Sequence, residues 1–76
     1  MIISVWLETE SGDNYNFLRE VDDETEMMQY IRDVMGTELA FVYDYIVNCI
    51  NSSSEAMTNL LREEINKLQS EEEYNV

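Results

Sequence analysis

The spacing of apolar residues changes once along this 76-residue chain, and the change limits the folds that the chain can adopt. Near the N-terminus, Ile3, Val5 and Leu7 occupy alternate positions, which is the period of a strand with one buried face. Beyond residue 23 the apolar residues recur every three or four positions, which is the period of a helix. The sequence therefore predicts an α+β fold in which strands precede helices.

Turn-forming residues divide the strand region into two parts. Residues 11–14 include Gly12 and Asp13, and residues of these types tolerate the positive φ that a tight turn needs. We expect strands over residues 2–10 and about 15–21, paired as an N-terminal antiparallel β-hairpin. Trp6 faces away from the apolar side of its strand. It could anchor a partner, but we expect a neighbouring helix to pack over it.

The rest of the chain predicts three helices. Asp23 can cap the first, with Glu26 in the capping-box position and Gly36 as the C-cap. The second, over residues 37–51, is apolar nearly all round, which is typical of a buried central helix. The third covers about residues 54–70, after a serine-rich break.

The chain is long enough for one domain only. It is 45% hydrophobic, which is enough for a folded core. We expect residues 1–70 to form a single α+β domain and residues 71–76 to form a frayed acidic tail. A core of this size stabilises modestly, so a homodimer or a bound partner could add to the stability.

Net charge restricts the partners of the chain. Seventeen acidic residues stand against four basic ones, giving a formal net charge of −13. Charge of this size opposes compaction by self-repulsion, so we expect it to serve binding. Nucleic acid and anionic membranes would be repelled, which excludes both as direct partners. A basic protein surface is the natural complement.

Catalytic chemistry has few candidate residues. The chain has no His and one Cys, which removes the usual general base, the usual zinc sites and the Cys–His nucleophile pair. Its two glycines form no phosphate-binding loop. Carboxylate pairs occur because acids are abundant everywhere. We therefore expect no enzyme activity, no cofactor and no metal site.

The N-terminal segment and the lone cysteine bear on localisation. The first seven residues are apolar but too few to span a membrane, and no basic residue accompanies them. A single cysteine, Cys49, suits a reducing compartment. We expect a cytoplasmic protein without a secretory signal.

The acids are spread over the expected strands, helices and tail. Carboxylates three or four residues apart on a helix lie about 5 to 6 Å apart at Cβ, close to the spacing of phosphates along a nucleic-acid strand. The densest segments are Asp22-Asp23-Glu24-Thr25-Glu26, Arg62-Glu63-Glu64 and Glu71-Glu72-Glu73. With these segments on a small α+β body, the chain resembles the acidic DNA-mimic inhibitors of phages and mobile elements, such as anti-restriction and anti-CRISPR proteins.

That resemblance implies an inhibitor that blocks the basic nucleic-acid-binding groove of a host protein, most plausibly a defence nuclease such as an RNA-guided one. It also implies the host cytoplasm as the site of action if a phage encodes the protein. The acids that we expect to pair with Lys or Arg of the partner are Asp22, Asp23, Glu24, Glu26, Asp33, Glu63 and Glu64.

Two other functions stay open. The chain could be an adaptor, antitoxin-like or a regulatory subunit, that binds through an apolar surface of aromatic and Met residues while its acids maintain solubility. It could also be a small structural protein that self-assembles. Exposure of the apolar residues in 37–51 would favour the adaptor, and their burial would favour the DNA mimic.

Overall fold

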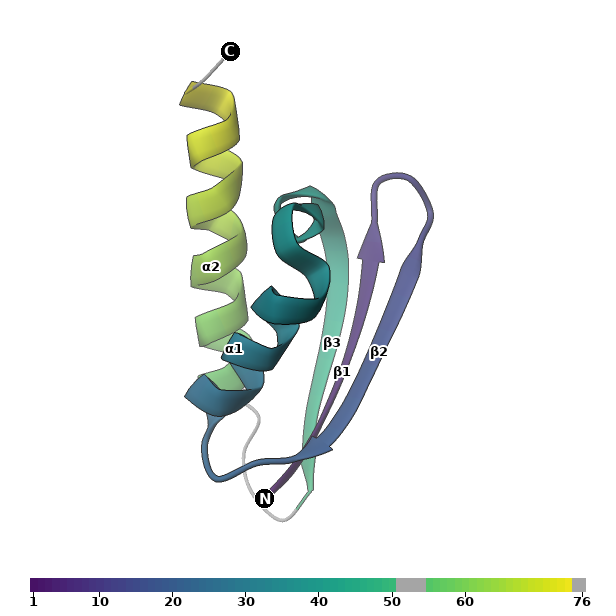
Figure 1. Ribbon diagram of the computed structural model, residues 1–76, viewed down its shortest axis with the longest axis vertical. Helices are drawn as coiled ribbons and strands as arrows, with labels where there is room; N and C mark the ends of the chain where they lie inside the picture. Colours follow the sequence, from purple (N-terminus) through teal and green to yellow (C-terminus); the bar gives the residue numbers. More distant parts are fainter. Residues whose placement is uncertain (51–54, 75–76) are drawn as a thin grey trace.

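Three strands form one antiparallel sheet with two α-helices packed against it, in a computed structural model that describes residues 1–50 and 55–74. Side chains are described as far as residue 70. The α+β class is as predicted (Figure 1). In chain order the elements are β1 (Ile2–Thr9), β2 (Asn14–Glu20), α1 (Glu24–Met35), the 3₁₀ turn η1 (Gly36–Phe41), β3 (Val42–Ile50) and α2 (Glu55–Tyr74).

The predicted N-terminal hairpin is confirmed. β1 and β2 pair antiparallel, with Val5 opposite Phe17. Gly12 has a φ of 92°, so the turn between the strands uses the left-handed region that glycine enters without strain. Val21, just after β2, is buried, and its N–H donates to the carbonyl of Met1.

The helix predicted over residues 37–51 is wrong. These residues form η1 and then β3, which pairs antiparallel with β1, so that the strand order is β2-β1-β3. Val, Ile and Tyr dominate this segment, and residues of these types favour the pleated surface of a strand over a helix. The described residues therefore form two α-helices rather than three, and the central buried element is a strand, β1.

The predicted start of α1 is confirmed by its capping bonds. The Asp23 carboxylate accepts a hydrogen bond from the N–H of Glu26 at 2.9 Å. The Glu26 carboxylate accepts one in return from the N–H of Asp22 at 2.8 Å. The helix ends at Gly36, which has a φ of 57°. These bonds satisfy backbone donors that the first turn of a helix leaves without partners.

Both helices cover the same face of the sheet. Along β1 the odd-numbered residues are buried and the even-numbered ones, apart from exposed Ile2, are half-buried, so the core lies on the odd-numbered side. Figure 1 shows α1, η1 and α2 gathered on one side of the molecule and the three strands on the other. The core side chains are Ile3, Val5, Leu7, Phe17, Val21, Met27, Met28, Ile31, Met35, Leu39, Val42, Met57, Leu61 and Ile65.

The C-terminal helix α2 is longer than the third helix that the sequence predicts. It covers Glu55–Tyr74 and so includes residues 71–74, which the sequence predicts to lie in an acidic tail. Its side chain Gln69 donates to the carbonyl of Val42 at 3.1 Å, which ties the helix to the start of β3. The serine-rich break at 51–54 and residues 75–76 lie outside the described residues. Across the described helices, none is long and apolar enough to cross a membrane.

The N-cap of α1 gives a first prediction. Asp23→Ala should lower the free energy of unfolding by about 1 kcal/mol, because the N–H of Glu26 loses its acceptor. In a domain of this size that loss lowers Tm by about 4 to 8 °C. Thermal unfolding followed by circular dichroism measures it.

Asp22→Ala is the matched control, since it removes the same charge one residue earlier at an exposed side chain. It should change the free energy of unfolding by less than about 0.5 kcal/mol. Equal losses in the two variants would show that charge, rather than the cap, stabilises the helix start.

Candidate functional site

The acids predicted at the start of α1 are partly occupied within the protein. Asp22, Asp23, Glu24 and Glu26 lie together at this helix end. Asp23 and Glu26 accept the capping hydrogen bonds described above, which fixes both carboxylates against the backbone. All but half-buried Glu24 are exposed. The cluster therefore stabilises the helix, and its outward-facing oxygens stay accessible.

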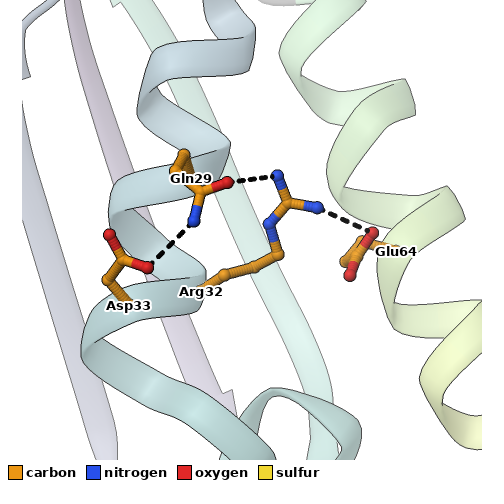
Figure 2. A network of polar contacts seen from close by, with 4 residues as sticks. All are labelled: Gln29, Arg32, Asp33 and Glu64. Atoms are coloured by element: carbon orange, nitrogen blue, oxygen red, sulfur yellow. Dashed lines mark hydrogen bonds and ion pairs between the residues drawn. The ribbon is translucent and has the colours of Figure 1, made fainter.

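Asp33 and Glu64 belong to a polar network between the two helices (Figure 2). The Arg32 guanidinium lies between them: its Nη1 is 3.5 Å from Glu64 Oε2, and its Nη2 donates to Gln29 Oε1 at 3.0 Å. Gln29 Nε2 donates in turn to Asp33 Oδ1 at 2.9 Å. Two of the acids that the sequence assigns to a partner therefore have partners within the protein: Glu64 pairs with Arg32, and Asp33 accepts from Gln29.

Basic residues also lie beside the other predicted acids. Glu63 and Glu64 line a hollow between α1 and α2 together with Arg32 and Lys67. A second hollow places Arg19 beside Glu26 and Asp33. The structure therefore gathers the predicted site acids on the helical side of the molecule, and it brings basic residues to the same side.

All four basic residues of the chain lie on that side. Arg19, although it belongs to β2, stacks on the ring of Tyr30 in α1, with its guanidinium carbon 4.3 Å from the ring centroid. Arg62 on α2 donates from Nε to the hydroxyl of Tyr45 at 3.1 Å. Arg32 and Lys67 line the hollow between the helices.

Neither of the helices in the described part of the chain covers the even-numbered face of β1 (Figure 1). We call this surface the open face. Trp6 lies at its centre, opposite Asn16 on β2 and Ile46 on β3. Trp6 is half-buried and takes no part in the core, so the prediction that a helix packs over it is wrong. The side chains of the open face are Ile2, Ser4, Trp6, Glu8, Asn14, Asn16, Leu18, Glu20, Asp44, Ile46, Asn48 and Ile50.

The apolar side chains of the open face are strongly exposed. Leu18 is 72% exposed, Ile46 54% and Ile50 49%. Methionines do not add to this surface, because Met27, Met28, Met35 and Met57 are buried in the core. An apolar surface is therefore present, but it consists of aromatic and aliphatic residues of the sheet.

A bulge at one end of the open face joins Tyr43 to Glu8. The pairing of β1 with β3 shifts between Glu8 and Thr9, which leaves Tyr43 as an extra residue. The Glu8 carboxylate accepts a hydrogen bond from the Tyr43 hydroxyl and raises the pKa of Tyr43 above its ordinary value of 10.0. Neighbouring negative charge and partial desolvation raise this pKa further.

More acids surround the hairpin turn beside this bulge. Glu10, Asp13 and Glu38 line a hollow together with the exposed ring of Phe41. Glu38 accepts a hydrogen bond from the Tyr15 hydroxyl. This end of the sheet is acidic and partly aromatic, and the four basic residues lie elsewhere. The sequence prediction of site residues omitted all of these positions.

The open face was missed because it requires β3. Within residues 42–50, the half-buried Tyr45, Val47 and Cys49 alternate with exposed Ile46 and Ile50. The sequence does not show this alternation, because the half-buried and the exposed positions carry apolar residues alike, and the segment also fits a helix that is apolar all round.

Groups of three or more His, Cys, Asp or Glu side chains suited to holding a metal ion are absent from the described part of the chain. Comparison of the chain with protein-family models, with curated proteins and with solved structures found no match. The arrangement of charge and apolar surface must therefore support any functional assignment.

The Tyr43–Glu8 contact gives a second prediction. Tyr43 should titrate above 10.0, and Glu8→Gln should bring its pKa back toward that value. Because the folded pKa exceeds the unfolded one, the contact stabilises the fold below pH 10.0, and this stabilisation is lost as pH rises through the folded pKa. Tyrosinate absorbance measures the titration, with Tyr43→Phe identifying the band of this residue. If Glu8→Gln leaves the titration unchanged, the hydrogen bond is absent in solution.

Proposed function

We propose that this protein is a non-catalytic binding module that attaches to a basic surface of another protein. The observation that carries the proposal is the excess of acidic over basic residues. Seventeen acids face four bases, and Arg32–Glu64 is the one salt bridge within the described side chains. This excess of negative charge is self-repelling, and a basic partner relieves that repulsion.

The apolar surface favours an adaptor over a pure imitation of nucleic acid. Tyr43, Ile46 and Ile50 are exposed on β3. Exposure of these apolar residues favours the adaptor, whereas their burial would have favoured the DNA mimic. A groove that holds phosphates offers cations and hydrogen-bond donors, and it gains little from contact with isoleucine. A protein–protein interface, in contrast, combines an apolar centre with a polar rim.

The second candidate is a DNA-mimicking inhibitor of a nucleic-acid-binding protein, such as a defence nuclease. The acidic end of the sheet is the specific feature that favours it. Glu8 and Asp44 lie opposite each other there, and Glu10, Asp13 and Glu38 surround the adjacent hairpin turn. Carboxylates grouped in this way without a nearby base could occupy phosphate sites of a basic groove.

Affinity capture followed by competition tests the proposed function. The immobilised protein should retain basic proteins from a cell lysate, and moderate salt should release them because salt screens the attraction. Neutralising Glu8 and Asp44 to Gln and Asn should weaken a contact at that end by about 1.5 to 3 kcal/mol for each acid that pairs with a cation. The same change at Asp22 and Glu63 is the charge-matched control.

A labelled DNA duplex then separates the two candidates. An adaptor and the duplex should occupy the purified partner together, whereas a DNA mimic should exclude the duplex. Retained proteins that are not basic, or retention that does not respond to salt, would contradict both candidates.

A further inference from the structure

The open face combines features that rarely stay uncovered in a protein. Trp6 stands on the central strand with Ile46 directly opposite and the strongly exposed Leu18 diagonal to it. Apolar side chains of the open face come from all three neighbouring strands, and exposed apolar surface gathered in this way marks binding sites. A large aromatic side chain at the centre is the usual anchor of a protein interface.

Charge decides what can cover this face. Its charged side chains are Glu8, Glu20 and Asp44, and all four bases of the chain lie on the helical side. A second copy stacked face to face with its strands aligned, parallel or antiparallel, would bring acidic ends against acidic ends, which disfavours the pairing. Nucleic acid and anionic lipid are repelled for the same reason. The charges complement a partner that is itself basic.

The distance between the acids at the two ends of the open face sets the length of a matching partner segment. Glu8 and Asp44 lie opposite each other at one end of the face, and Glu20 lies opposite Ile2 at the other end. Residues 2 and 8 of β1 are six steps apart, which at about 3.3 Å for each residue corresponds to about 20 Å. The apolar side chains of Trp6, Ile46 and Leu18 occupy the interval.

We propose that the open face binds a segment of a basic protein in which apolar side chains are flanked on both sides by Lys or Arg, with the basic groups about 20 Å apart. This inference rests on the proposed function and names its binding site. The apolar middle of the segment covers Trp6 and Ile46, and its two basic ends reach Glu20 on one side and Glu8 with Asp44 on the other.

Three synthetic peptides of equal charge test the inference. The first has lysines at both ends and leucines and serines between them, over about 20 Å. The second has the same composition with the lysines grouped in the middle, and the third is oligolysine. Trp6 is the only tryptophan of the chain, so its fluorescence reports binding at the open face. The first peptide should shift this emission to shorter wavelength and bind about tenfold or more tightly than the others.

Matched variants locate the site. Leu18→Thr with Ile46→Thr removes apolar surface while placing threonine, a β-branched residue that favours strands, at both positions, and it should weaken binding of the first peptide about tenfold or more. Val34→Thr is the control, because Val34 is 53% exposed but lies on α1, away from the open face. It should change the affinity by less than about twofold. If the double variant unfolds, Leu18→Thr alone replaces it in the binding test, because Leu18 is the most exposed apolar residue of the open face.

The outcomes separate the inference from the proposed function. If all three peptides bind equally and the threonine variants bind like the wild type, the attraction is charge alone, and the inference fails while the proposed function stands. If no peptide binds at low salt, the proposed function fails as well. If sedimentation shows self-association that the threonine variants abolish, the occupant is a second copy, and the inference is overturned.

Discussion

The pairing of β1 with β3 is the interaction on which the rest of this structure depends. A hairpin of β1 and β2 alone would be marginally stable. When residues 42–50 return to the free edge of β1, that strand gains hydrogen bonds on both sides and becomes the centre of the sheet. The alternation of side chains along β1 then divides the molecule in two. Ile3, Val5 and Leu7 face the helices, and the even-numbered residues face outward.

This division also separates the charges. The few basic residues all lie on the helical side, where Arg32 pairs with Glu64 in the one salt bridge among the described side chains. The sheet side holds acids together with exposed apolar residues. Repulsion among those acids destabilises the fold, and a cationic partner that covers this surface would relieve the repulsion. The fold therefore places the proposed binding surface on the sheet, although most of the acid-dense sequence lies in the helices.

The sequence predicted the local features and missed the long-range one. Alternation at Ile3, Val5 and Leu7 identified β1, and the Asp23 and Glu26 pair identified the start of α1, because each depends on neighbouring residues. Residues 42–50 fit both a strand and an all-round apolar helix, and pairing with a strand about 40 residues earlier decides between them. No local pattern contains that information.

The residues proposed to bind a partner were likewise predicted only where a local pattern identifies them. Charge density pointed to Asp22 through Glu26 and to Glu63 and Glu64, and the structure places these acids near Arg19, Arg32 and Lys67. The open face could not be predicted while β3 was taken for a helix, because Ile46 and Trp6 meet only across paired strands. A burial pattern that depends on pairing is read from the sequence only after the pairing is known.

Nuclear Overhauser contacts between the backbone protons of residues 2–9 and 42–50, in isotope-labelled protein, test the pairing of β1 with β3 most directly. We expect cross-strand contacts in antiparallel register, with Val5 opposite Val47 and Leu7 opposite Tyr45. Contacts between residues three apart within 42–50, without contacts to β1, would show a helix there. That result would contradict the sheet, the open face and the binding site derived from it.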